Sequence, residues 1–141
     1  MSGYSETPLA QKLGIRPGAR LAVLQAPDGF EQTLGGLPSG VQLLRQTRPP
    51  LDVVVAFFTA RSALDRRLPH LRAALSPSGG LWIAWPKRSS GRATDLTEDV
   101  VRGLGLGAGL VDNKVCAIDE VWSGLRLVYR LADRPRGASV S

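Results

Sequence analysis

The segment over residues 87–94, KRSSGRAT, holds the residue types with the clearest binding chemistry in this sequence. It combines cations with adjacent hydroxyls and leads directly into a predicted helix. Cations, hydroxyls and the free N–H groups of a helix N-terminus are the groups with which proteins hold phosphate or sulfate. A loop whose cations are simply solvated explains the pattern equally well. The candidate ligand-binding residues in this segment are Lys87, Arg88, Ser89 and Ser90.

A second group of polar residues lies nearer the C-terminus. Asp112, Asn113 and Lys114 are consecutive, and Asp119 is followed closely by Trp122. Two acids and an amide beside an aromatic ring fit a ligand site or an acid/base pair. The simpler interpretation, which we favour, makes Asp-Asn the turn before a strand and places the tryptophan in the core.

Asp28 and Gly29 form a third candidate site, in a turn after the first predicted strand. Other chemistry has little support. Cys116 alternates with small apolar residues in a predicted strand, so we expect an inert packed thiol. His70 is the only histidine and is expected to be an exposed helix residue. One cysteine and one histidine argue against a metal site, and no serine lies in a nucleophile-elbow pattern.

The clearest of the elements that must position these residues is a βαβ unit. Apolar runs over 53–58 and 81–85, set between glycine and proline breakers, predict strands buried on both faces. Leucines at helical spacing between the runs predict a helix, which Pro69 either kinks or delays. Residues 76–80, Ser-Pro-Ser-Gly-Gly, are expected to turn the chain before the second run. This order is typical of a parallel sheet.

Shorter elements are predicted on either side. A short helix over 7–14, a strand over 20–25, a helix from Phe30 to Leu34 and an edge strand over 41–44 come before the central unit. A last helix and two strands, over 114–122 and 125–131, follow it, with the strands joined as a tight hairpin at Ser123-Gly124. Three helix caps are predicted: Asp28 for the helix at 30–34, Ser62 with Asp65 for the central helix, and Asp95 with Glu98 for the last.

The composition is that of one ordinary globular domain. The chain has 141 residues, of which 43% are hydrophobic and 21% charged. We expect a single α/β domain over 1–133 and a disordered basic tail over 134–141. The chain shows neither a signal-peptide pattern nor a run of apolar residues long enough for a membrane span. The single cysteine suits a reducing compartment, so the cytoplasm is the expected location.

The net charge of +6 raises the question of nucleic-acid binding. The 18 basic residues comprise 15 Arg and 3 Lys, and they are spread along the chain rather than clustered. A nucleic-acid surface needs a clustered stripe, so general basicity is the favoured interpretation. Nucleic-acid association stays open if the following cations share one face: Arg61, Arg66, Arg67, Arg72, Lys87, Arg88 and Arg92.

The order of elements, with a buried strand after Gly79-Gly80 and a closing hairpin, resembles the second half of the class I S-adenosylmethionine-dependent methyltransferase fold. The whole chain more closely resembles an uncharacterised bacterial family known as domain of unknown function 3052. This resemblance implies a fold and a cytoplasmic setting but no reaction. It is carried by residues 3–5, 12–15, 26–30, 80–82, 85–87, 94–101, 109–120 and 122–128. The expected fold is a three-layer Rossmann-like sheet, mostly parallel with a C-terminal antiparallel hairpin, resembling a shortened class I methyltransferase.

The features that bind the cofactor in such methyltransferases are incomplete here. The first strand normally runs into a glycine-rich turn, and an acidic residue at the end of the second strand holds the ribose hydroxyls. This chain has Gly29 alone in that turn, stiffened by Pro27, and Arg45-Gln46 in place of the acid. Residues 45–52 leave no room for the helix and strand of the full fold. These departures predict that no cofactor is bound.

Three hypotheses of function follow. The first is a non-catalytic binding or regulatory module for an anionic small molecule or a protein partner, held near Asp28, residues 87–90 and residues 112–114. An exposed edge strand would also support a homodimer. The second is a minimal S-adenosylmethionine-dependent methyltransferase with Trp82, Trp85 and Trp122 as stacking groups. The third is the nucleic-acid-associated protein described above.

Overall fold

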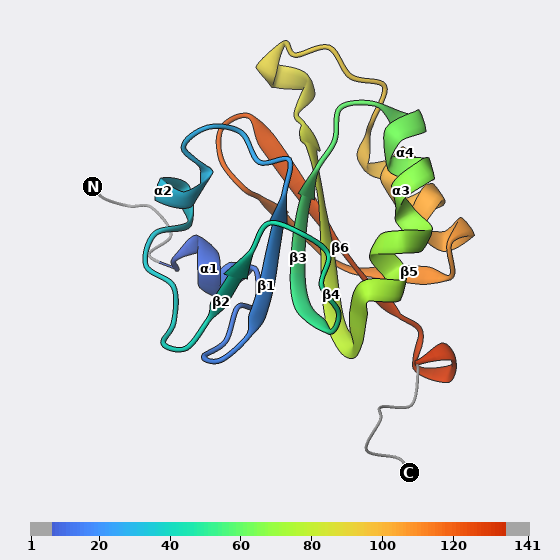
Figure 1. The fold of residues 1–141 in the computed structure, drawn as a ribbon. Helices are drawn as coiled ribbons and strands as arrows, with labels where there is room; N and C mark the ends of the chain where they lie inside the picture. The colour runs from blue at the N-terminus through green and yellow to red at the C-terminus, as the bar shows by residue number, and fades with distance from the viewer. Residues whose placement is uncertain (1–6, 135–141) are drawn as a thin grey trace.

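The computed structural model of the protein describes residues 7–134, which form one six-stranded sheet with helices on both faces (Figure 1). The strand order is β2-β1-β3-β4-β6-β5. β1 is parallel to β2 and β3, and β3 to β4, whereas β6 is antiparallel to β4 and β5. The expected fold class, a mostly parallel sheet with an antiparallel hairpin, is confirmed. The strands are β1 Arg20–Leu24, β2 Gln42–Leu44, β3 Leu51–Phe57, β4 Leu75–Pro86, β5 Leu110–Ala117 and β6 Trp122–Tyr129.

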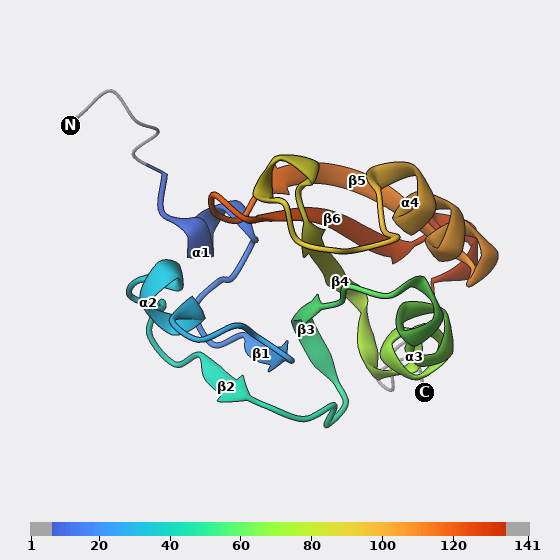
Figure 2. The same ribbon diagram turned by 90° about the horizontal axis from the view of Figure 1, so that it is seen from above.

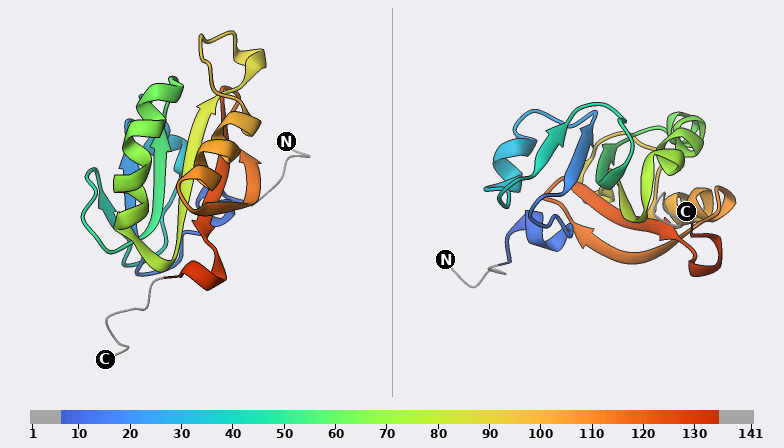
Figure 3. Two further views of the ribbon diagram at one scale, coloured as in Figure 1. Left: turned by 90° about the vertical axis from the view of Figure 1, so that its right-hand side faces the viewer. Right: turned by 60° about the horizontal axis from the view of Figure 1, so that its bottom comes forward.

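Four α-helices of the described chain make the outer layers (Figures 2 and 3). α3 and α4 cover one face of the sheet, and α1 and α2 cover the other, so the molecule has the three layers that we expected. Each face has its own buried apolar cluster, with alternate residues of the central strands pointing to opposite sides. The helices are α1 Leu9–Lys12, α2 Phe30–Leu34, α3 Arg61–Ala74 and α4 Glu98–Gly107, with short 3₁₀ turns η1 Arg88–Ser90 and η2 Leu131–Asp133.

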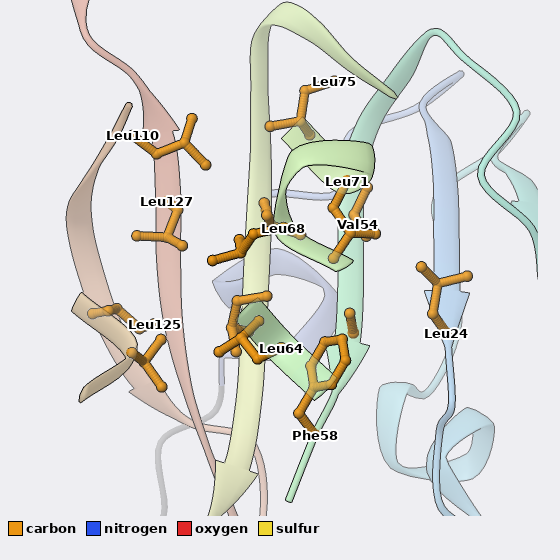
Figure 4. Close-up of a cluster of buried hydrophobic side chains, with 14 of the residues drawn as sticks. Leu24, Val54, Phe58, Leu64, Leu68, Leu71, Leu75, Leu110, Leu125 and Leu127 are labelled. Carbon is orange, nitrogen blue, oxygen red and sulfur yellow. The ribbon is translucent and has the colours of Figure 1, made fainter. Parts of the chain in front are cut away.

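Helix α3 places its leucines on the sheet as their spacing predicts. Leu64, Leu68 and Leu71 are fully buried and point onto β3 and β4 (Figure 4). Each such burial contributes about 1.5–3 kcal/mol. The helix runs without interruption through Pro69, so the predicted late start is wrong.

The predicted turn at residues 76–80 is instead an irregular part of β4. This strand pairs with β3 on both sides of a register shift, which leaves extra residues between Leu75 and Gly80. Gly79 is required there because a Cβ would lie 2.7 Å from the carbonyl oxygen of Leu51. The two glycines therefore mark close packing between strands rather than chain reversal.

The predicted hairpin turn is also misplaced. Ser123 and Gly124 lie inside β6, paired with Trp85 and Ala84 of β4. Gly124 has no side chain because Trp82 and Ile118 pack on it, and a Cβ would lie 3.1 Å from both. The actual turn spans residues 118–121.

All three predicted caps differ from the structure. The N-cap of α2 is Gly29 and that of α3 is Ala60, and neither gives a side-chain cap. Asp95 accepts a hydrogen bond of 2.7 Å from the backbone N–H of Arg61, so it caps α3 rather than α4. Thr97 caps α4 by accepting from Val100 at 3.1 Å. Capping residues can come from a distant loop, which local spacing does not reveal.

Nearly all of the predicted basic tail, residues 135–141, lies outside the described residues, as does the segment 1–6. Within residues 7–134, no helix has the length and apolar character needed to cross a membrane.

Candidate functional site

The candidate cations Lys87 and Arg88 lie at the carboxyl end of β4, where open α/β sheets commonly bind ligands. Together with Arg92 they line a cavity of about 510 Å³, which Thr97 and Ser123 also line. We call this cavity the carboxyl-edge groove. Its volume lies within the ~300–1,000 Å³ typical of small-molecule sites. The loop that carries the cations stands above the sheet in Figure 1.

Backbone hydrogen bonds fix the base of this loop. The N–H of Lys87 donates to the carbonyl oxygen of Val121 at 2.7 Å. The hydroxyl of Ser90 donates to the carbonyl oxygen of Lys87 at 2.6 Å and accepts from the N–H of Arg92 at 3.2 Å. Ser90 therefore shapes the loop, while Ser89 stays exposed and available.

The cations of the groove are not paired with any described carboxylate, and the one carboxylate that lines the groove, Glu98, is paired with Arg102. None of Lys87, Arg88 and Arg92 forms an ion pair with a carboxylate of residues 7–134. Arg92 instead lies over the ring of Trp122, with 5.9 Å from its Cζ to the ring centroid. At the N-terminus of α4, Thr97 accepts from the N–H of Val100 and the first turn carries Glu98 and Asp99, so an anion here would be held by the side chains of the cations.

The carboxyl ends of β1 and β3 mark the point where the strand order reverses, which is the usual cofactor position in doubly wound sheets. Gln25, the residue after β1, lies at this point and has a left-handed φ of 58°. Its Nε2 donates to the carbonyl oxygen of Phe57 at 2.8 Å. This bond links the side chain of Gln25, which follows β1, to the backbone of Phe57 in β3, across the point where the strand order reverses.

Aromatic side chains pack together near Gln25. Phe57 packs edge-on against Phe30 and Trp122, with ring centroids 4.9 and 5.0 Å apart. The cavity left beside Gln25 has about 280 Å³, below the usual lower limit of ~300 Å³ for small-molecule sites.

The neighbouring turn with Asp28 and Gly29 lines a hollow of about 260 Å³. Gly29 has φ 86°, a conformation that glycine adopts without strain. The opposite wall is Arg45, which forms an ion pair with Glu31 of α2. Arg45 follows β2, so the position where an acid would hold a ribose carries a cation that is already paired.

The candidate group Asp112-Asn113-Lys114 lies within β5, not in a turn before it, and a register shift divides it. Asp112 is opposite Leu127 of β6, whereas Lys114 is opposite Arg126. Residues two apart in a regular strand share a face, but this bulge turns Asp112 toward α4 and Lys114 toward the other face. Asp112 accepts from Nε of Arg102 at 3.0 Å, and Lys114 Nζ donates to the carbonyl oxygen of Lys12 at 2.9 Å.

Asp119 organises the turn of the hairpin. One of its carboxylate oxygens accepts from the N–H groups of Val121 and Trp122, both at 2.8 Å. Trp122 is 6% exposed and belongs to the core, while Glu120 is exposed. The structure therefore brings neither Asp119 nor residues 112–114 to the carboxyl-edge groove, although Trp122 lies beneath Arg92.

The three tryptophans proposed as stacking groups are buried. Trp82 is fully buried, with its indole N–H donating to the carbonyl oxygen of Leu13 at 2.9 Å. Trp85 is 5% exposed. Stacking of a ligand on Trp82 is therefore excluded, because both ring faces lie inside the protein.

The single cysteine and the single histidine were also considered in the sequence. Cys116 is half-buried, and burial raises the pKa of its thiol, partly offset by the charges of Lys114 and Lys12. His70 is exposed and lies 2.6 Å from the hydroxyl of Thr47. No group of three metal-ligating side chains occurs within residues 7–134.

Arg72 of α3 lies away from the groove. Arg72 lies near the opposite end of α3 from Arg61, about 16 Å along the axis at ~1.5 Å per residue. Its guanidinium packs against the ring of Tyr129, 5.0 Å from the centroid. The basic residues listed for nucleic-acid binding thus do not all share one face.

Two residues at these sites were missed from the sequence. Gln25 was assigned to the first strand without a role, since a left-handed backbone at a glutamine has no sequence signal. Arg126 was assigned only to a face of a strand, and its surroundings are described below. Alternation predicted that face correctly, because Leu125, Leu127 and Tyr129 are in the opposite cluster.

Comparison with solved structures confirms the methyltransferase-like fold. An S-adenosylmethionine-dependent methyltransferase from Aquifex aeolicus is 13% identical with a TM-score of 0.60, over 84% of this chain and 86% of that one. Magnesium protoporphyrin IX methyltransferase from Synechocystis PCC 6803, with bound S-adenosylhomocysteine, is 12% identical with a TM-score of 0.53, over 81% and 75%. The ribosomal protein L11 methylase from Lactobacillus delbrueckii subsp. bulgaricus has 10% identity and a TM-score of 0.58, over 86% and 75%.

At these identities the likeness shows the fold alone. No protein-family model matches the chain, and no curated protein sequence matches it. The resemblance to domain of unknown function 3052 therefore stays a prediction from the residues.

Proposed function

We propose that this protein is a methyltransferase-fold binding module that works without S-adenosylmethionine and holds an anionic small molecule in the carboxyl-edge groove. The observation that carries the proposal is the hydrogen bond from Gln25 to Phe57 across the point where the strand order reverses. A cofactor at that point would have to displace Gln25 and then find room beside packed aromatic rings.

The groove supplies what an anion needs. Lys87, Arg88 and Arg92 are charged, close in sequence and unpaired with any described carboxylate. Guanidinium and ammonium groups form strong, charge-assisted hydrogen bonds with phosphate and carboxylate oxygens. A protein partner that presents an acidic side chain would use the same cations and is the alternative ligand.

Calorimetric titration tests the proposal directly. We expect S-adenosylmethionine and S-adenosylhomocysteine to give no heat of binding, and phosphate, sulfate or a nucleoside monophosphate to bind with a salt-dependent affinity. Arg88→Ala should weaken that binding at least tenfold, since a hydrogen bond to a charged group is worth about 1.5–3 kcal/mol. Arg130→Ala removes an exposed cation at the far end of β6 and serves as the matched control.

A minimal S-adenosylmethionine-dependent methyltransferase is the second candidate. It is favoured by the similarity to the Synechocystis enzyme, whose structures contain bound S-adenosylhomocysteine or S-adenosylmethionine and match 81–86% of this chain. Gly29, with its left-handed backbone after β1, would be the closest approach to the cofactor. Saturable binding of the adenosyl compounds to the native chain would establish this candidate and remove the first.

The proposal also includes a cytoplasmic location and a homodimer. A single half-buried cysteine suits a reducing compartment, which supports the cytoplasm. β2 is an edge strand of three residues, and a second copy could pair with it to form a homodimer.

A further inference from the structure

A second cavity lies at the amino ends of the parallel strands, opposite the carboxyl-edge groove. Its volume is about 640 Å³. It is bounded by the end of α1, the loop that leads to β1, the beginnings of β3 and β4, and the middle of the β5–β6 hairpin. We call it the amino-edge cavity. It shares no lining residue with the carboxyl-edge groove.

Cations dominate its wall. Lys12, Arg16, Lys114 and Arg126 all line the cavity, against one carboxylate, Asp52. That carboxylate is already engaged, because one oxygen accepts from the backbone N–H of Arg20 at 2.8 Å and the other from the hydroxyl of Ser76 at 3.3 Å. None of the four cations forms an ion pair within residues 7–134.

The β-bulge in β5 makes this arrangement specific. It places Lys114 directly opposite Arg126 across the antiparallel pair, where regular pairing would have placed Asn113. Like charges directly opposite one another destabilise a sheet. A bulge that creates such a pair opposes stability and is the kind of feature found where a strand presents side chains to a ligand.

The Arg126 side chain occupies the space that a side chain on Gly80 would need. A Cβ on Gly80 of β4 would overlap its guanidinium, so the guanidinium occupies the space beside the glycine backbone. Arg126 is half-buried and no described residue accepts a hydrogen bond from it. Burial without a partner also lowers its pKa, the opposite of what a paired guanidinium shows. A half-buried cation normally has an acceptor, and here the cavity is where one would lie.

We propose that the amino-edge cavity is a second binding site, for a small molecule that carries two or more phosphate groups. Arg126 is the central ligand-binding residue, with Lys114 beside it and Lys12 and Arg16 at the rim. Several phosphates are required to balance an excess of positive charge spread over four side chains, and the volume exceeds what one phosphate would fill. Guanidinium groups match phosphate oxygens in pairs. This site is independent of the carboxyl-edge groove.

Pyrophosphate and ADP are suitable probes for calorimetric titration of the whole protein at low salt. We expect both to bind, with orthophosphate at least tenfold weaker. Arg126→Met keeps the aliphatic stem over Gly80 and should reduce the affinity at least tenfold. Lys114→Met, at an exposed position, should reduce it several-fold and provides a test if Arg126→Met does not fold. The titrations are made in the Arg88→Ala background, which removes anion binding at the carboxyl-edge groove. In that background Arg130→Ala should leave pyrophosphate binding unchanged.

The midpoint of thermal unfolding distinguishes a residue that binds the ligand from one that stabilises the fold. Arg126→Met should leave the midpoint of the ligand-free protein unchanged or raise it, and should abolish the increase caused by pyrophosphate. The proposal is overturned if neither probe binds in the Arg88→Ala background, if binding there survives both Arg126→Met and Lys114→Met, or if Arg130→Ala weakens it as much as Arg126→Met. Binding of citrate in place of pyrophosphate would overturn the assignment to phosphates.

Discussion

The guanidinium of Arg126 on β6 rests on the backbone of Gly80 on β4, in the space where any other residue would carry its Cβ. Gly80 is extended, so its lack of a side chain is required by contact rather than by conformation. Two residues distant in sequence thus depend on each other. The amino-edge cavity keeps its central cation because a glycine lies beneath it.

This dependence can be measured with a double-mutant cycle. Gly80→Ala alone should cost about 1 kcal/mol, since the guanidinium must move away. In the Arg126→Ala background the same change should cost nothing, or stabilise the strand by ~0.5–1 kcal/mol, the usual advantage of alanine over glycine. Urea unfolding of the four proteins gives the coupling energy. Equal effects of Gly80→Ala in both backgrounds would contradict the contact.

Gln25 combines a hydrogen bond with a left-handed backbone, and two substitutions separate the contributions. Gln25→Ala should lose about 1 kcal/mol, because the bond to Phe57 disappears while the strained φ of 58° remains. Gln25→Gly loses the same bond but relieves ~1–2 kcal/mol of backbone strain, so its stability should be close to that of the native protein. The midpoint of urea unfolding measures both. A glycine variant less stable than the alanine variant would show that the backbone is not strained.

Asp95 should act as the cap of α3, although it lies in the loop before α4. Asp95→Ala removes the acceptor of the Arg61 N–H and should cost about 1 kcal/mol. Ser62→Ala is the control, because the sequence pattern assigned the cap to Ser62 and the structure gives it none. Its effect should stay within ~0.5 kcal/mol. Hydrogen exchange at the Arg61 amide should accelerate in Asp95→Ala alone, and acceleration in Ser62→Ala would point to the local cap instead.

Cys116 should report on the charge of the amino-edge cavity. Its pKa is raised by burial, so its thiolate should be scarce at pH 8 and its alkylation slower than that of a free thiol. Lys114 opposes this shift, so Lys114→Met should slow the reaction further. The same reaction should speed up as pH rises through and beyond the ordinary thiol value of about 8.5.

Alkylation of Cys116 should also report the binding of a ligand in the amino-edge cavity. Pyrophosphate bound beside Lys12 and Lys114 would offset their charge and slow alkylation of Cys116 in the native protein. It should have no effect in Arg126→Met. Faster alkylation on addition of pyrophosphate would place the anion elsewhere.

The central elements of the fold could be predicted because their signals are local. The apolar runs of β3 and β4 are apolar on both faces, so they must be buried between two layers. The leucines of α3 share one face at helical spacing. The cations at residues 87–92 were placed correctly after β4 for the same reason. The hairpin turn was misassigned because glycine is common in turns. Gly124 is instead needed inside β6, because Trp82 and Ile118 pack against its backbone.

The sequence by itself determined the layers, the order of most elements and the presence of cations after β4. The tertiary structure alone decided which polar groups meet: Gln25 with Phe57, Asp95 with Arg61, and Lys114 with Arg126. Each of these pairs joins residues from different strands, loops or helices. Periodicity reports the face on which a side chain lies, whereas its partner depends on the register between strands, and in β5 a single bulge changes that register.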